Sequence, residues 1–174
     1  MPSKKHFIIT SLTLGAIAAA SGLLIGAANL ITRDQIKKNE AKKFDAGITA
    51  IFGDNTKASE FNKNVLNLEY IDSSYIIHQG EQPVGWAVRA TGSNMYGKIS
   101  LIAGFEYEGK AFKGIYVVTN EQTYASTLVD NYINPLNHGD ANLDDVSCGA
   151  TYGAKLVRSL ITAAQGYVDG IIYD

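Results

Sequence analysis

Residues 85–91, Gly-Trp-Ala-Val-Arg-Ala-Thr, and residues 99–107, Ile-Ser-Leu-Ile-Ala-Gly-Phe-Glu-Tyr, decide the fold. In both stretches apolar residues occupy every second position, and these are Trp86, Val88, Ala90, Ile99, Leu101, Ala103, Phe105 and Tyr107. Successive side chains of a strand point to opposite faces of a sheet, so a period of two predicts strands. Each stretch therefore indicates a strand with one apolar face.

Further strands are expected on both sides of this pair. Residues 70–78 predict an earlier strand, which a turn over Gly80–Pro83 connects to the next one. Glu108-Gly109-Lys110 has the composition of a hairpin turn, after which residues 114–119 return as a strand. Short connections of this kind favour antiparallel neighbours.

Helices are predicted after the last strand. A short helix is expected over residues 124–132, ended by Asn134-Pro135, with the polar and turn-rich segment 137–146 behind it. A longer helix is expected over residues 152–168, because its apolar residues follow the helical period. These residues are Leu156, Val157, Leu160, Ile161, Ala164, Tyr167 and Val168. The expected fold class is α+β, a mostly antiparallel sheet with packed helices.

The amino-terminal segment has the composition of a membrane span. No charged residue occurs between Phe7 and Thr32, and a helix of that length reaches about 39 Å, against a hydrocarbon core of about 30 Å. A cleaved signal peptide is the competing interpretation, since Ala16–Ala20 offers small residues. The apolar run extends well beyond a usual signal peptide, which favours a retained transmembrane helix.

Three segments are therefore expected. Residues 1–32 form a short amino-terminal stub and the transmembrane helix, residues 33–56 a connecting helix that Gly53-Asp54-Asn55 ends, and residues 57–174 a globular domain. Basic residues are more frequent after the span than before it, which by itself would place the domain in the cytoplasm. That rule is weaker for a large translocated domain, so the charge pattern leaves the orientation open.

Composition excludes several function classes. The net charge of −2 offers no basic excess for nucleic acid. The single cysteine, Cys148, excludes an internal disulfide and a four-thiolate metal site made by this chain alone. His6, His78 and His138 lie far apart and form none of the short spacings of metal ligands. No metal site is expected.

The segment most informative about function is Asp145-Val146-Ser147-Cys148-Gly149-Ala150-Thr151, directly before the last helix. It resembles the flavin-attachment motif of the FMN-binding domain shared by the G subunit of Rnf complexes and the C subunit of Na⁺-pumping NADH:quinone reductases. Asp145, Gly149, Ala150 and Thr151 match that motif, whereas Cys148 stands where the family has Ser or Thr, and Gly153-Ala154 where it often has Thr-Ser. The resemblance implies FMN bonded through its phosphate to Thr151 by a flavin transferase.

Upstream segments follow the order of the same family. They are a single span, Gly85-Trp86-Ala87-Val88, Met95-Tyr96-Gly97-Lys98-Ile99, the hairpin over 99–119, and Asn120-Glu121-Gln122-Thr123. The last resembles the family's loop that approaches the flavin, which adds Glu121 and Thr123 to the expected FMN site beside Asp145, Cys148, Gly149, Ala150 and Thr151. The family's Pro-Gly-x-Gly is replaced by Tyr124-Ala125-Ser126, and the segment before Asp145 is short, so a more open pocket is expected.

More than one role is open to the residues in and near the motif. An anionic phosphate at Thr151 would meet the unpaired N–H groups and the positive dipole end of the last helix. Thr151 could instead simply cap that helix. Tyr124, Tyr152 and Trp86 could stack on the flavin or belong to the core. Cys148 is either redox-active or inert packing, and packing is the commoner role.

The resemblance implies an electron-transfer subunit of a membrane-bound, ion-translocating ferredoxin–NAD oxidoreductase, an Rnf-like complex. Its partners would be the other membrane subunits, its FMN domain would lie outside the cytoplasm, and it would have no substrate turnover and no catalytic residue of its own. Two alternatives remain. One is a stand-alone membrane-anchored flavoprotein for extracellular electron transfer, and the other is a structural subunit that has lost its flavin.

Overall fold

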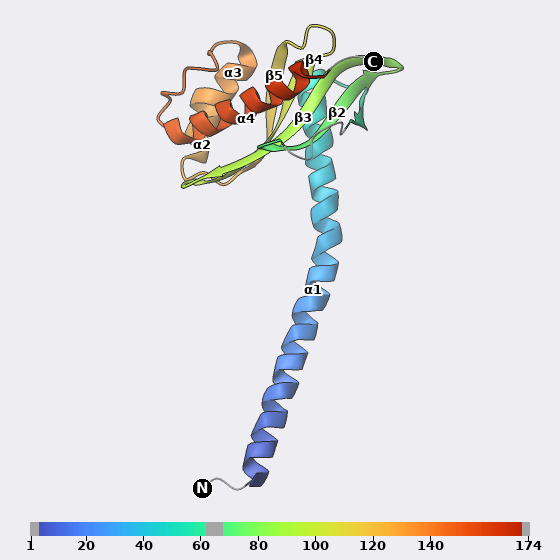
Figure 1. The fold of residues 1–174 in the computed structure, drawn as a ribbon, viewed down its shortest axis with the longest axis vertical. Helices are drawn as coiled ribbons and strands as arrows, with labels where there is room; N and C mark the ends of the chain where they lie inside the picture. The colour runs from blue at the N-terminus through green and yellow to red at the C-terminus, as the bar shows by residue number, and fades with distance from the viewer. Residues whose placement is uncertain (1–3, 62–67, 172–174) are drawn as a thin grey trace. The chain divides into compact units, whose positions relative to one another are not determined.

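A computed structural model describes residues 4–61 and 68–171 (Figure 1). Its core is one five-stranded sheet in the order β1-β2-β3-β4-β5, with every neighbouring pair antiparallel. The strands are β1 (Thr56–Glu60), β2 (Ile71–Gln79), β3 (Gln82–Asn94), β4 (Gly97–Glu106) and β5 (Phe112–Asn120). The helices are α1 (Lys4–Phe52), α2 (Ala125–Leu128), the π-helical turn η2 (Val129–Ile133), α3 (Asn134–His138) and α4 (Thr151–Asp169). The expected α+β class is confirmed.

The chain divides into two units, Met1–Lys42 and Lys43–Asp174. In the first unit, α1 includes a 23-residue segment, Ile8–Leu30, with a mean hydropathy of 2.0. Its large apolar side chains are exposed, as Leu23 is at 76%. This segment is long and apolar enough to cross a membrane once.

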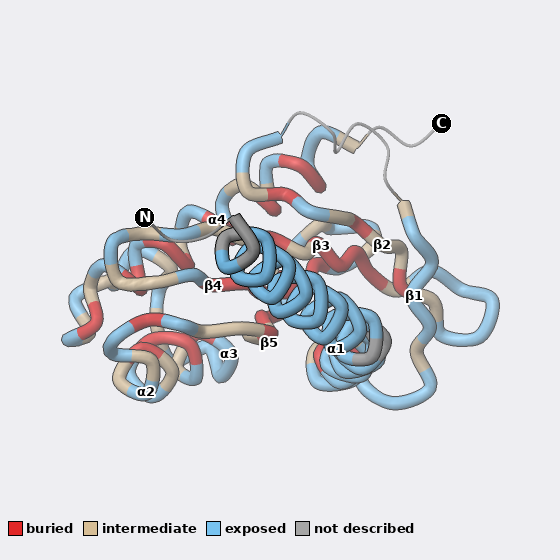
Figure 2. Tube along the Cα trace, turned by 90° about the horizontal axis from the view of Figure 1, so that it is seen from below, coloured by how far each residue is buried: buried red, intermediate tan, exposed pale blue. Residues whose placement is uncertain are grey.

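The second unit buries both faces of its central strands (Figure 2). α4 covers one face, where all seven apolar residues predicted for its inner side are buried. The last turns of α1 cover the other face, where Ile48 packs with Ala87 and Ile102. The alternating pattern had indicated only one apolar face, so burial of the second face is a finding of the structure.

Two glycines bring α1 close to this second face. A Cβ on Gly85 would lie 2.2 Å from the Phe52 ring, and one on Gly104 would lie 2.4 Å from Ile51. The Lys43 amino group also donates a hydrogen bond to the Val118 carbonyl, at 3.1 Å. Because Gly85 and Gly104 have no side chain, the end of α1 packs directly on the sheet.

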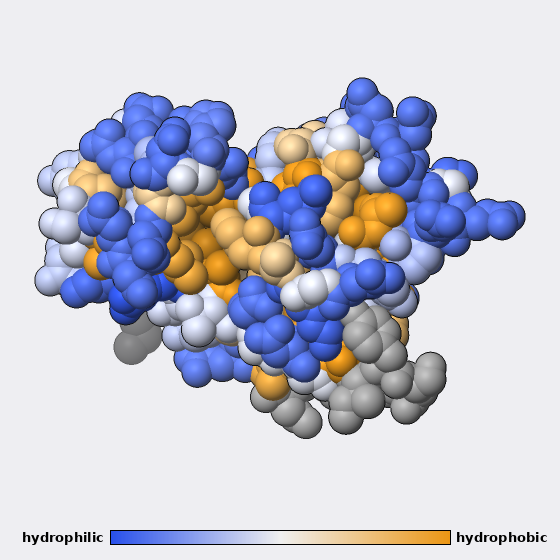
Figure 3. All heavy atoms as spheres, turned by 90° about the horizontal axis from the view of Figure 1, so that it is seen from above, coloured by the Kyte–Doolittle hydropathy of each residue, from blue (hydrophilic) through white to orange (hydrophobic). Residues whose placement is uncertain are grey.

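Figure 3 shows the molecule from above. On this face hydrophilic residues form most of the rim, and hydrophobic residues gather in the middle.

Several element boundaries differ from the prediction. β1 was missed because its sequence, Thr-Lys-Ala-Ser-Glu, is polar and almost fully exposed at the sheet edge. β3 and β4 both run on to the tip of their hairpin, where Asn94 pairs with Gly97. The predicted strands had covered only residues 85–91 and 99–107.

The predicted stop at Asn134-Pro135 is wrong. Helix continues as η2 and then α3, with Pro135 in the first turn of α3. Proline needs no N–H partner at that position, and the wider turn of η2 precedes it, so the ring is accommodated without breaking the helix.

Replacing Ile48 with Ala tests whether the end of α1 belongs to the folded core. Because Ile48 is only 3% exposed, the variant should lose about 2–5 kcal/mol of unfolding free energy. Urea unfolding of the full chain in detergent, followed by the fluorescence of the single tryptophan, Trp86, measures this. Thr49→Ala, on the exposed side of the same turn, is the matched control. Equal stabilities of the two variants would contradict the packing.

Candidate functional site

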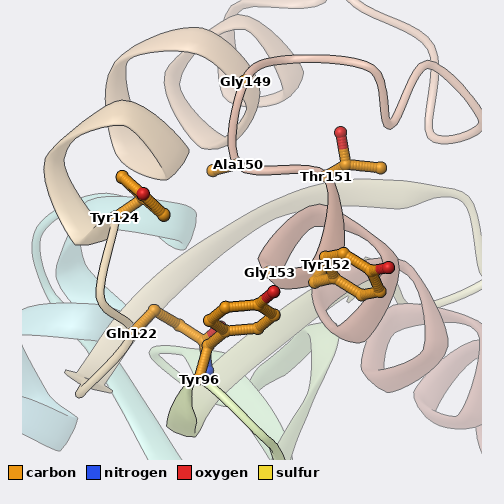
Figure 4. A pocket seen from close by; sticks show the side chains of 8 residues that line it. All are labelled: Tyr96, Gln122, Tyr124, Gly149, Ala150, Thr151, Tyr152 and Gly153. Atoms are coloured by element: carbon orange, nitrogen blue, oxygen red, sulfur yellow. The ribbon is translucent and has the colours of Figure 1, made fainter.

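A pocket of about 200 Å³ lies at the amino-terminal end of α4 (Figure 4). Three chain segments build it: the tip of the β3–β4 hairpin, the segment after β5, and the turn that leads into α4. Its lining residues are Tyr96, Gln122, Tyr124, Gly149, Ala150, Thr151, Tyr152 and Gly153. The carboxyl-terminal part of the motif thus opens onto a pocket.

Thr151 is the first residue of α4, and Ala150 occupies the cap position before it. No side-chain hydrogen bond caps this helix, so the alternative that Thr151 caps it is wrong. Within the described residues, no hydrogen bond to the Thr151 hydroxyl is found, and the side chain is half-buried at the pocket. Its oxygen is therefore available for another bond.

The start of α4 favours an anion. The first helical backbone bond runs from the Ala154 N–H to the Ala150 carbonyl, at 3.0 Å, which leaves the N–H groups of residues 151–153 without a partner inside the helix. The first turn has no acidic residue. The Lys155 amino group lies 5.9 Å from the centre of the Tyr152 ring. Free N–H groups and the positive end of the helix dipole thus lie at the start of the helix that carries Thr151, and Lys155 adds a positive charge one turn further along the same helix.

The turn before α4 requires a glycine. Gly149 has φ +84°, in the left-handed region, and a Cβ there would lie 3.3 Å from the Thr127 methyl group. The Asn131 amide donates to the Cys148 carbonyl at 3.1 Å. Together these features hold residues 148–150 against α2 and η2, so that the chain enters α4 with Thr151 at the pocket.

Asn94, at the hairpin tip, connects the three segments. Its side-chain oxygen accepts hydrogen bonds from the Tyr96 N–H at 2.8 Å and from the Gln122 side-chain amide at 3.1 Å. Its side-chain nitrogen donates to the Tyr152 carbonyl at 3.1 Å. Gln122, which is 7% exposed, also donates to the Gly97 carbonyl. The polar groups behind the pocket are therefore bonded to one another.

Aromatic rings form the walls. The rings of Tyr96 and Tyr152 lie 5.2 Å apart at an angle of 37°. Tyr124 lies across the pocket from this pair (Figure 4). Tyr124 and Tyr152 are each 58% exposed, so neither ring is buried in the core. Exposed aromatic faces of this kind can stack on a planar ring.

The structure separates the residues that the sequence had grouped. Gly149, Ala150 and Thr151 line the pocket, whereas Cys148, Asp145, Glu121 and Thr123 do not. Cys148 packs against the core cluster that α4 covers. Asp145, Glu121 and Thr123 are exposed.

Glu121 and Thr123 contribute through their backbone N–H groups. These donate to the carbonyls of Lys98 and Tyr96, and so extend the β4–β5 pairing toward the pocket.

Of the three candidate stacking residues, Trp86 is a core residue at 2% exposure, stacked on Tyr107 at 5.5 Å. Tyr124 and Tyr152 do line the pocket.

Sequence reasoning missed Tyr96, Gln122 and Gly153. Tyr96 and Gln122 stand inside segments that had been recognised only for their order along the chain. A Cβ on Gly153 would lie 2.9 Å from Leu128, which explains why a small residue is needed where the resembling family has threonine. Within residues 4–61 and 68–171, no cluster of His, Cys, Asp and Glu could hold a metal ion.

FMN agrees with the chemistry of these residues. Thr151 offers an oxygen for the ester, the start of α4 offers N–H groups for the phosphate, and the tyrosines offer aromatic faces for the ring. Ligand pockets commonly have about 300–1,000 Å³, so this smaller one would enclose only part of a flavin. The part of a flavin outside the pocket would then stay exposed to solvent.

Tyr132 holds the loop that leads to the motif. Its hydroxyl is buried and donates to the Leu143 carbonyl. Burial raises the pKa of Tyr132 to about 12, an effect that Arg158 opposes and that Cys148, Asp144 and Asp145 reinforce. Since the folded-state pKa lies above the unfolded value of 10.0, this group stabilises the fold fully below pH 10 and loses that contribution as the pH rises toward 12.

Tyr132→Phe should lower the unfolding free energy at neutral pH by about 1 kcal/mol, the size of one lost hydrogen bond. Between pH 10 and pH 12 the variant should lose less stability than the parent chain, because the titrating group is gone. Urea unfolding across that pH range measures both effects, with the exposed Tyr124→Phe as control. A variant as pH-sensitive as the parent would disprove the assignment.

No protein-family model matches this sequence, and no curated protein matches it. The cofactor assignment therefore depends on the pocket itself and on the resemblance of the motif.

Proposed function

We propose that this chain is a membrane-anchored electron-transfer subunit that carries FMN, bonded through its phosphate to Thr151, in an Rnf-like ion-translocating complex. The observation that supports this most directly is the Thr151 hydroxyl. It is unbonded within the described residues and belongs to the first residue of α4, and that residue lines a pocket with tyrosine walls. The motif resemblance gives that hydroxyl its chemical role.

The ester requires little of the protein. When it forms, the Thr151 oxygen replaces a leaving group on the flavin donor's phosphorus, and the hydroxyl proton is released. A flavin transferase is the class of enzyme that would do this. The product is still an anion, and the N–H groups of residues 151–153 together with Lys155 stabilise its charge.

Bound FMN would supply the redox chemistry, accepting electrons from one membrane partner and passing them to another. The chain's own residues anchor and position it. Thr151 prevents loss of the cofactor, the tyrosines contact its ring, and Gln122 holds the hairpin tip against the segment after β5. No residue of the chain is assigned a catalytic proton transfer.

Helix α1 gives the subunit its place in the membrane. The segment Ile8–Leu30 would span the bilayer once and keep the flavin domain near the other subunits of the complex. The domain would lie outside the cytoplasm, as in the resembling family, where a covalent bond retains a cofactor that could not be replenished.

Coexpression of the full chain with a flavin transferase tests the attachment site. Intact-mass measurement of the denatured protein should show one FMN adduct on the parent chain, and none on Thr151→Ala. Thr162→Ala is the matched control, since Thr162 is an exposed threonine on the same helix, and it should keep the adduct. An adduct on Thr151→Ala would move the attachment elsewhere. A parent chain without an adduct would favour a structural subunit that lacks flavin.

Protease treatment of intact cells and spheroplasts tests the orientation. A tag at the carboxyl terminus should be removed in spheroplasts without lysis, because the domain is proposed to face outward. The same intact mass shows whether the amino-terminal segment is retained or cleaved as a signal peptide. Protection of the tag until the membrane is lysed would place the domain in the cytoplasm.

A further inference from the structure

We propose that Asn94 is the residue that positions the flavin ring, because it holds the Tyr96–Tyr152 wall of the pocket in place. The inference rests on the proposed function, since it concerns a flavin attached at Thr151. It adds a positioning residue that lies outside the attachment motif and more than fifty residues before it in the chain.

The bonds of Asn94 determine how its amide is oriented. The Tyr96 backbone N–H can only donate, so the atom 2.8 Å from it must be the amide oxygen. The Tyr152 carbonyl can only accept, so the atom 3.1 Å from it must be the amide nitrogen. The Gln122 amide donates to the same Asn94 oxygen at 3.1 Å, which agrees with this orientation.

These bonds act on the aromatic wall through the backbone. The Asn94 side chain hydrogen-bonds to the main chain of both tyrosines. Tyr96 lies on the hairpin tip, and Tyr152 lies on the first turn of α4. The two rings consequently lie 5.2 Å apart although their residues belong to different elements. The hydrogen bonds of Asn94 thus connect the backbones that carry the two rings of the wall.

Packing on the other side prevents α4 from moving to compensate. Gly153 lies so close to Leu128 and to Gln122 that a Cβ would be 2.9 Å and 3.4 Å from their side chains. Gly97 lies so close to the Glu121 carbonyl that a Cβ would be 2.2 Å from its oxygen. Hairpin tip, α4 and the segment after β5 are therefore packed together, and Asn94 bonds to all three.

A planar ring tethered at Thr151 meets this wall on one side and Tyr124 on the other (Figure 4). Stacking on aromatic faces restricts the rotation of the ring and quenches flavin fluorescence. If Asn94 positions the wall, its loss should loosen the ring while leaving the covalent bond intact. This separates ring positioning from attachment.

The experiment compares four forms of the full chain, each coexpressed with a flavin transferase and purified in detergent. They are the parent, Asn94→Ala, Asn94→Asp and the control Asn134→Ala, which removes an exposed asparagine at the start of α3. Intact mass reports attachment, flavin fluorescence yield and anisotropy report the ring, and thermal unfolding reports the fold.

The parent and Asn134→Ala should show quenched flavin with high anisotropy. In Asn94→Ala the adduct should persist, while the ratio of stacked to free ring should fall about two- to tenfold, the size expected for one aromatic pair. Asn94→Asp should also loosen the ring, because it keeps both acceptor bonds but turns a carboxylate oxygen, which can only accept, toward the Tyr152 carbonyl.

Two results would overturn the inference alone: an adduct whose fluorescence is unchanged in Asn94→Ala, or a parent flavin that is bright and rotates freely. If Asn94→Ala does not fold, Tyr152→Leu decides, because Tyr152 is 58% exposed and its loss should release the ring without unfolding the chain. Unchanged fluorescence in that variant would also overturn it. Absence of any adduct on the parent would instead remove the proposed function, and the inference with it.

Discussion

Burial of the β3–β4 hairpin on both faces is the constraint on which the structure depends. Ten residue pairs, from Gly85 with Glu106 to Asn94 with Gly97, align β3 with the whole length of β4. α4 packs on one face and the end of α1 on the other. A strand buried on both sides cannot slip by one residue without moving apolar side chains between the two cores. The hairpin tip is therefore held in one place.

The site depends on that fixed tip. Asn94 and Gly97 extend beyond the predicted strands to the point where α4 begins and where the chain leaves β5. Hydrogen bonds from Asn94 and Gln122 then satisfy the polar groups of three segments that are far apart in the sequence. In a partly buried place these bonds matter because each unpaired group would cost about 1–3 kcal/mol. A pocket with an anion-favouring helix start is the result.

Much of the fold could be predicted from local patterns. The period of two located β3 and β4, the hairpin turn before residues 114–119 located β5, and the helical period located α4 together with its buried side. The pattern failed where the structural reason was not local. β1 is a polar edge strand that only its pairing with β2 makes a strand. Pro135 was taken for a helix end, although it lies in the first turn of α3, where its missing N–H costs nothing.

The features of the candidate site also fall into two groups, those that the local sequence predicted and those that only tertiary contacts decided. The sequence by itself determined that a threonine follows a Gly-Ala turn at the start of an amphipathic helix, and that an uncharged segment near the amino terminus could span a membrane. Only the tertiary structure decided that Ala150 rather than Thr151 occupies the cap position of α4, that Trp86 is core, and that Tyr96, Gln122 and Tyr152 line one pocket with Thr151. Periodicity and turn composition depend on neighbours along the chain. Contacts between a hairpin tip and a helix start depend on how two buried faces pack, which no local pattern encodes.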